Sequence, residues 1–171
     1  MIGIILGSKS DLSYVKSYLS LFEDFSVKFT FAVSSAHRTP QRTKELVKKM
    51  EEKGVKVIIA VAGAAAHLPG VIASYTTLPV IGVPIPSSDL KGLDALLAIV
   101  QMPGGIPVAT TAIGKAGVKN AILLGFSILA INDESLSKKL KDFRNSQKEK
   151  VIKDSEETEK EISSYGTFFS L

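Results

Sequence analysis

VKFTFAVSSAHRTPQRTKELVKKMEEKGVKVIIAVA (residues 27–62) contains two short apolar runs, at 27–33 and 57–62. Between them, apolar residues recur at helical spacing, Pro40 suits the first position of a helix, and Gly54 suits its end. Each apolar run has the length of a buried strand. The stretch therefore predicts a strand, a helix and a second strand, which is the repeating unit of a parallel sheet.

The same alternation continues on both sides of this stretch. Further strands are predicted at 2–6, 78–85 and 107–113, and further helices at 12–22, 90–100 and 118–131. Strands that alternate with helices favour a parallel sheet covered by helices on both faces, because right-handed crossovers place the helices there. We therefore expect an α/β fold, a three-layer αβα sandwich around a doubly wound parallel sheet.

The C-terminal segment departs from this alternation. Leu136, Leu140 and Phe143 form one apolar stripe, and the chain becomes highly charged further on. We expect a helix from about 134 to beyond 148, and an arm over 134–171 that reaches another subunit, with Phe168 and Phe169 as its anchor. The arm would belong to a single domain that spans 1–171. The apolar helix at 118–131 also favours association between subunits.

Composition restricts the function classes. The chain has 171 residues, is 45% hydrophobic and has a formal net charge of +4, yet its lysines are interspersed with acidic residues. That mixture is typical of a solvated surface, so no nucleic-acid partner is expected. No apolar run reaches membrane-spanning length, and cysteine is absent. We expect a cytoplasmic protein without a membrane partner and without thiol chemistry.

Polar clusters directly follow the first three predicted strands. They are GSKSD at 7–11, SSAHRTP at 34–40 and GAAAHLPG at 63–70, and the two histidines of the chain lie in the second and third clusters. In an open parallel sheet, ligands bind outside the carboxyl ends of the strands. The sequence therefore predicts a small-molecule site where these loops meet.

The first cluster combines a glycine at a strand end with hydroxyl groups and a following helix. Backbone N–H groups there favour a phosphate, Ser8 or Ser10 can donate to it, and Asp11 can accept from ribose hydroxyls. The alternative is that Ser10 or Asp11 only caps the helix. The segment 112–117 is not a Walker loop, because Gly114-Lys115 lacks the earlier glycine and the following Ser or Thr.

The second and third clusters place histidines near a cation and small residues. Imidazole gives and takes protons near neutral pH, and a guanidinium holds phosphate by two hydrogen bonds, so His37 beside Arg38 suits proton transfer next to an anion clamp. A surface or capping role for His37 is the alternative. His67 either shapes the pocket or holds its loop. Neither histidine has further ligands at metal-site spacing, so no metal is predicted.

Together these motifs resemble the N5-carboxyaminoimidazole ribonucleotide mutase family. The resemblance rests on GSKSD at 7–11, SAHRTP at 35–40, AAHLPG at 65–70, IVQMPGGIPV at 99–108 and AIGKAG at 112–117. It implies a Rossmann- or flavodoxin-like subunit, a homo-octamer, and conversion of N5-carboxyaminoimidazole ribonucleotide to 4-carboxy-5-aminoimidazole ribonucleotide. It also implies that no cofactor is needed, neither ATP nor metal nor biotin.

The resemblance also implies roles for individual residues. His37 would transfer the proton, Ser8 and Arg38 would hold the phosphate, and Asp11 the ribose. The full substrate-binding set is expected to be Ser8, Ser10, Asp11, Ser35, Ala36, Arg38, Gly63, Ala64, Ala65, His67 and Leu68.

Two positions depart from the family pattern, because Val61 and Ala64 stand where the family usually has glycine. Their Cβ atoms could narrow the pocket floor or, if Ala64 needs a positive φ, strain the loop. The alternative functions are a related carboxylase that uses free CO2 on aminoimidazole ribonucleotide, and a non-catalytic nucleotide-binding module. AAHLPG and QMPGGIPV favour the mutase over the carboxylase, and His37 beside Arg38 argues against the module.

Overall fold

The computed structural model describes residues 1–166, and the chain divides into two compact units. The first unit spans Met1–Leu129 and contains the whole sheet, and the second begins at Ala130. The expectation of a single domain with an arm over 134–171 stays a prediction.

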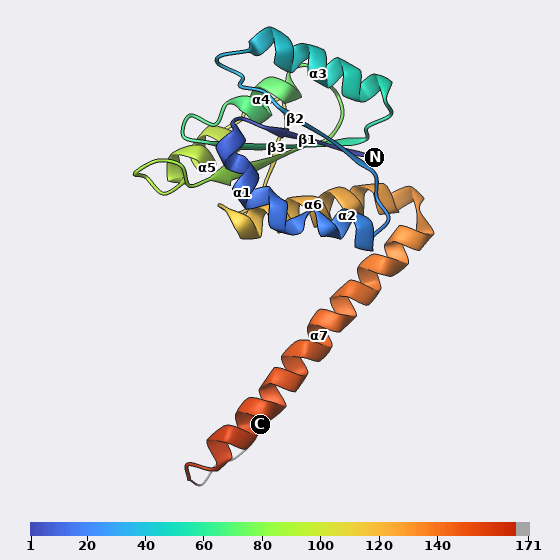
Figure 1. The fold of residues 1–171 in the computed structure, drawn as a ribbon, viewed down its shortest axis with the longest axis vertical. Helices are drawn as coiled ribbons and strands as arrows, with labels where there is room; N and C mark the ends of the chain where they lie inside the picture. The colour runs from blue at the N-terminus through green and yellow to red at the C-terminus, as the bar shows by residue number, and fades with distance from the viewer. Residues whose placement is uncertain (167–171) are drawn as a thin grey trace. The chain divides into compact units, whose positions relative to one another are not determined.

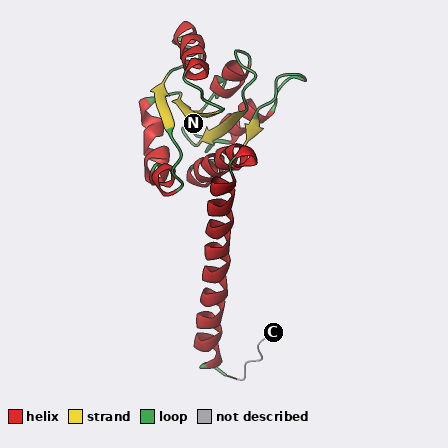
Figure 2. Ribbon diagram, turned by 90° about the vertical axis from the view of Figure 1, so that its right-hand side faces the viewer, coloured by secondary structure: helices red, strands yellow, loops and turns green. Residues whose placement is uncertain are grey.

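A five-stranded parallel sheet forms the centre of the first unit, which confirms the predicted fold class (Figures 1 and 2). Its strands are β1 (Ile2–Leu6), β2 (Phe29–Val33), β3 (Val57–Gly63), β4 (Val80–Ile85) and β5 (Ala109–Thr110), in the spatial order β2-β1-β3-β4-β5. The direction in which successive strands are added reverses between β1 and β3, since β2 lies on one side of β1 and β3, β4 and β5 lie on the other. This is the flavodoxin-like order, whose ligands bind at that switch point.

The register of the strands aligns their carboxyl ends. Leu6, the last residue of β1, pairs with Val33 of β2 on one side and Val61 of β3 on the other. The backbone continues this alignment, since the Gly7 N–H donates to the Val61 carbonyl at 2.9 Å and the Ser34 N–H donates to the Leu6 carbonyl at 2.9 Å. The loops after the three strands therefore begin at the same edge of the sheet.

Helices cover both faces of the sheet (Figure 1). On one face, α3 (Pro40–Glu52), α4 (Leu68–Ala73) and α5 (Leu93–Val100) contribute Val47, Ile72 and Ile99 to a buried cluster with the strands. On the other face lie α1 (Leu12–Val15), α2 (Ser20–Asp24) and α6 (Lys115–Leu129). An edge-to-face contact between Phe22 of α2 and Phe126 of α6, with ring centroids 5.2 Å apart, packs this layer.

Three elements differ from the sequence-based expectations. The helix expected at 12–22 is divided into α1, a 3₁₀ turn (Lys16–Tyr18) and α2. The strand expected at 107–113 pairs only over β5, because Pro84 of the neighbouring β4 has no N–H to extend the ladder. The loop expected at 63–70 turns into α4 from Leu68 onward, with Pro69 in its first turn.

Helix α6, which the sequence analysis assigned to a subunit contact, buries one face within its own unit. Val118, Ile122 and Phe126 of that face are almost inaccessible to solvent. Leu124 on its outer side is partly exposed, and Lys119 and Asn120 add polar groups. The apolar sequence is thus largely explained by contact with the sheet, and the subunit contact stays a prediction.

The second unit is dominated by α7 (Glu134–Ser163), preceded by a 3₁₀ turn (Ala130–Asn132). Asp133 is the N-cap, and its Oδ1 accepts from the Leu136 N–H at 2.9 Å. The predicted helix from about 134 to beyond 148 is therefore confirmed. Phe168 and Phe169, the expected anchor, lie outside the described residues.

Candidate functional site

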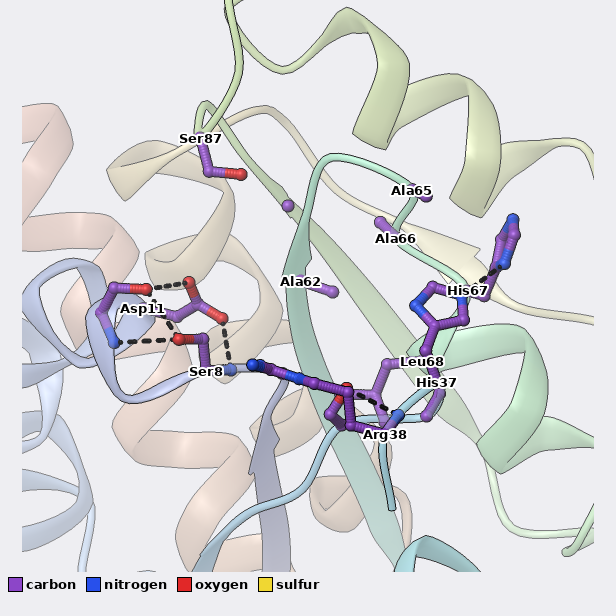
Figure 3. Close-up of a pocket in the computed structure, with 15 residues that line it drawn as sticks. Ser8, Asp11, His37, Arg38, Ala62, Ala65, Ala66, His67, Leu68 and Ser87 are labelled. Atoms are coloured by element: carbon purple, nitrogen blue, oxygen red, sulfur yellow. Dashed lines mark hydrogen bonds between the residues drawn. The ribbon is translucent and has the colours of Figure 1, made fainter. Parts of the chain in front are cut away.

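A cavity of about 400 Å³ opens at the carboxyl edge of the sheet, at the β1/β3 switch point (Figure 3). Its volume lies in the range of small-molecule sites. The lining comes from the loops after the first four strands: Gly7, Ser8, Ser10, Asp11, Ser35, Ala36, His37, Arg38, Ala62, Gly63, Ala65, Ala66, His67, Leu68 and Ser87. The structure thus brings together every residue of the predicted site except Ala64.

The loop after β1 is held by a capping box. The Ser8 N–H donates to Asp11 Oδ2 at 3.0 Å, and the Ser8 side chain accepts from Ser10, whose hydroxyl lies 2.9 Å away. Only a three-residue 3₁₀ turn and the four-residue α1 follow, so the helix dipole is weaker here than the sequence suggested. Ser8 is therefore the N-cap of this turn and Asp11 its capping-box partner, while the hydroxyl groups of both Ser8 and Ser10 line the cavity.

Asp11 is an almost fully buried carboxylate at the edge of this cavity. Burial raises the pKa of Asp11 above its ordinary value, and hydrogen bonds from Ser8 and Ser10 oppose that shift. Its Oδ1 atom receives only the longer contact from the Ser10 hydroxyl, at 3.3 Å. The carboxylate can therefore accept from a ligand hydroxyl that reaches the cavity.

The loop after β2 is fastened by buried hydroxyl groups. Thr43 of α3 is fully buried, and its Oγ1 lies 2.8 Å from Ser34 Oγ and donates to the Thr39 carbonyl at 3.2 Å. Thr39 in turn accepts from the Ser35 N–H at 3.1 Å. These bonds fix the backbone on either side of His37 and so orient its ring.

The two histidines come together although 30 residues separate them in the sequence. His37 Nε2 lies 2.8 Å from His67 Nδ1, and the rings meet nearly edge to face. A hydrogen bond between two imidazoles uses one shared proton, so one ring donates and the other accepts. The nitrogen of His37 that is not engaged, Nδ1, faces the cavity (Figure 3). This nitrogen is positioned to exchange a proton with a bound ligand.

Arg38, the residue that follows His37 in the chain, supplies a cation to the cavity lining. Its backbone N–H and its Nε both approach Ser35 Oγ, at 3.3 and 3.4 Å. The guanidinium extends toward the Ser8 loop (Figure 3). A guanidinium close to the hydroxyl groups of Ser8 and Ser10 suits a phosphate, which accepts several charge-assisted hydrogen bonds.

The end of β3 and the loop that follows it contain Val61 and Ala64, the two residues that depart from the family pattern. Val61 is fully buried inside β3 and is not among the residues that line the cavity, so its side chain does not narrow the pocket floor. Ala64 adopts φ 51°, in the left-handed region that favours glycine. The backbone strain foreseen for Ala64 is therefore present, while the cavity wall is formed by Gly63, Ala65 and Ala66.

Ser87 lines the cavity and was missed by sequence reasoning. It follows β4, so the rule that drew attention to the first three strand ends could have found it. Gly63 permits its approach, because a Cβ at Gly63 would lie 2.9 Å from the Ile85 carbonyl oxygen and would collide with the Ser87 side chain. Close packing at this point therefore requires glycine.

Among residues 1–166, no three His, Asp or Glu side chains gather in a way that could hold a metal ion. None of the helices described has both the length and the apolar character needed to cross a membrane.

The fold and the cavity define a doubly wound α/β protein with a small-molecule site at its switch point. The chain belongs to the AIR carboxylase family, whose model matches residues 1–150. It is 55% identical to the N5-carboxyaminoimidazole ribonucleotide mutase of Pyrococcus horikoshii over 151 residues, which are 88% of this chain and 84% of the relative. It is 51% identical to the Bacillus subtilis mutase over 157 residues, 92% of this chain and 97% of the relative.

A solved structure agrees with these sequence matches. The crystal structure of Treponema denticola PurE superimposes with a TM-score of 0.82 at 27% identity, covering 91% of this chain and 96% of the other. The family match over residues 1–150 extends through the sheet, the cavity and the first part of α7.

Proposed function

We propose that this chain converts N5-carboxyaminoimidazole ribonucleotide to 4-carboxy-5-aminoimidazole ribonucleotide in purine biosynthesis, with His37 as the general acid and base. The observation that carries the proposal is the cavity-facing Nδ1 of His37, beside Arg38 and opposite Ser8 and Asp11. The names of the relatives, all N5-carboxyaminoimidazole ribonucleotide mutases, support it.

In this proposal the substrate is anchored by its ribose phosphate. Arg38 and Ser8 hold the phosphate, Asp11 accepts from ribose hydroxyls, and the base lies toward the loop 63–68. The small side chains of Ala65 and Ala66 leave room for the migrating carboxylate. Ser10, Ser35, Ala36, His67 and Leu68 complete the wall.

The chemistry needs one proton, which His37 supplies and recovers. Protonated His37 gives its proton to N5, the N5–carboxyl bond breaks, and CO2 and aminoimidazole ribonucleotide remain in the cavity. Carbon C4 then forms a bond to CO2, and the proton on C4 returns to His37. No proton is gained or lost over the cycle, and retention of CO2 in a closed site takes the place of an activated carrier.

Assembly as a homo-octamer and location in the cytoplasm belong to the same proposal. Exposed apolar residues on α5 support assembly, because Leu93, Leu97 and Val100 are each about half exposed and repeat at helical spacing. Light scattering at micromolar concentration measures the assembly, and a monomer mass would contradict it.

The test is turnover by the purified protein and by His37→Asn, with the carbamate substrate or with aminoimidazole ribonucleotide plus bicarbonate. We expect the parent to use the carbamate far faster than the bicarbonate mixture, and His37→Asn to abolish turnover while ligand affinity changes little. His67→Asn is the matched control and is expected to lower turnover less.

Three results would contradict the proposal. Turnover by His37→Asn within a few fold of the parent would remove the assigned proton donor. Faster turnover of the bicarbonate mixture would make the chain a carboxylase. Binding without turnover in either assay would make it a nucleotide-binding module.

A further inference from the structure

Ser87 lines the cavity, yet the proposed function gives its hydroxyl group no task. The residue is exposed, and its hydroxyl group points into the cavity (Figure 3). Among residues 1–166 this hydroxyl group has no hydrogen-bond partner. A free polar group on the wall of a ligand cavity can bond a ligand without giving up a bond inside the protein.

The backbone around Ser87 fixes the direction of its side chain. Pro86 precedes it and has a restricted φ, and the Ser87 N–H donates to the Ile85 carbonyl at 2.9 Å in a tight turn. The side chain lies directly over Gly63, where a Cβ would collide with the hydroxyl group. Because the hydroxyl group is held in place before a ligand arrives, little conformational entropy is lost when it forms a bond.

The loop that contains Ser87 lies next to the helix that follows Asp11. Helix α1 begins directly after Asp11, and the hydroxyl group of its Tyr14 approaches the Pro86 carbonyl at 3.5 Å. Figure 3 shows Asp11 and Ser87 on the same side of the cavity, away from His37. The carboxylate and the hydroxyl group can therefore reach the same part of a bound ligand.

The order of the polar groups along the cavity matches the order of atoms in a ribonucleotide, provided that the proposed function holds. Arg38 and Ser8 then bind the phosphate, Asp11 binds the ribose, and the base lies toward the loop that begins at Gly63. In the ribose, C2′ is bonded to the carbon that carries the base, whereas C3′ lies nearer the phosphate end. Ser87 lies over Gly63 on the side of Asp11, which is the position of the 2′-hydroxyl group.

We propose that Ser87 is a specificity-determining residue that hydrogen-bonds the ribose 2′-hydroxyl group and so favours ribonucleotides over 2′-deoxyribonucleotides. A serine hydroxyl group both donates and accepts, whereas an ionised Asp11 only accepts. Ser87 therefore complements Asp11, because it can accept from or donate to the second hydroxyl group of the same sugar. A 2′-deoxyribonucleotide leaves Ser87 without this bond.

Calorimetric titration of two ligands into two proteins tests this assignment. The ligands are 4-carboxy-5-aminoimidazole ribonucleotide, the product of the proposed reaction, and its 2′-deoxy analogue. The proteins are the parent and Ser87→Ala. We expect the ratio of ribo to 2′-deoxy affinity to fall roughly five-fold in Ser87→Ala, which is the effect of one neutral hydrogen bond. The affinity for the 2′-deoxy ligand should be the same in both proteins.

Two controls isolate the contact. Ser88→Ala removes the neighbouring hydroxyl group, which accepts from the Leu90 N–H at 3.3 Å and does not line the cavity, so the affinity ratio should stay at the parent value. The 3′-deoxy analogue keeps the 2′-hydroxyl group and loses the one nearer the phosphate. Ser87→Ala should therefore weaken binding of the 3′-deoxy analogue by the same factor as binding of the ribonucleotide.

Each other outcome overturns a defined part of the reasoning. An unchanged affinity ratio in Ser87→Ala would remove Ser87 from the 2′-hydroxyl group and leave the proposed function intact. An equal loss of affinity for the ribo and 2′-deoxy ligands would place the Ser87 contact on the base or the phosphate instead. A parent protein that binds neither ligand would overturn the proposed function and this assignment with it.

Discussion

Thr43→Val tests whether buried hydroxyl groups orient the loop that presents His37. Thr43 is fully buried, and valine keeps its shape while removing the hydroxyl that bonds Ser34 and the Thr39 carbonyl. Each lost hydrogen bond costs about 1 kcal/mol, so the free energy of unfolding should fall by about 2 kcal/mol. For a chain of this size that corresponds to a Tm lower by roughly 4–8 °C.

Urea-induced unfolding and substrate titration together make the assay. Because the loop also positions Arg38, Thr43→Val should raise KM for the ribonucleotide as well as lower the unfolding midpoint. Thr43→Ser is the control, since it keeps the hydroxyl and loses only a methyl group worth about 0.8 kcal/mol, and its KM should equal that of the parent. Unchanged stability and unchanged KM in the valine variant would refute the reasoning.

Three further predictions concern the cavity and the arm. Burial raises the pKa of Asp11, which means that the folded protein prefers the neutral carboxyl group. The contribution of this group to stability is therefore fully present below the unfolded pKa and is lost as pH rises through the folded pKa. Asp11→Asn should therefore stabilise the protein most at neutral pH, and a gain in Tm that persists unchanged in acid would contradict this. Arg38→Ala should weaken ribonucleotide binding more than Ser8→Ala, because charge-assisted hydrogen bonds contribute about 1.5–3 kcal/mol against about 1 for neutral ones; equal affinity for phosphorylated and dephosphorylated ligands in calorimetry would exclude the phosphate role. Truncation after Lys150 should lower Tm or loosen the assembly and retain turnover, whereas an inactive truncated protein that is folded and assembled would place the arm in the active site.

The sequence by itself determined the fold class and the location of the site. Apolar runs separated by helical spacing are compatible only with strands and helices in alternation, and that alternation leads to a parallel sheet by right-handed crossovers. Polar clusters at strand ends then had to meet at one edge. For this reason Ser8, Asp11, His37 and Arg38 could be predicted as cavity residues without coordinates.

Only the tertiary structure decided which side chains touch. The bond between His37 and His67 joins loops after different strands, and its 2.8 Å depends on strand register that no local pattern encodes. The buried position of Val61 and the positive φ of Ala64 likewise depend on how β3 packs and on how its loop turns into α4. Local periodicity specifies elements, whereas distances of a few ångströms between side chains are set by the packing of all elements together.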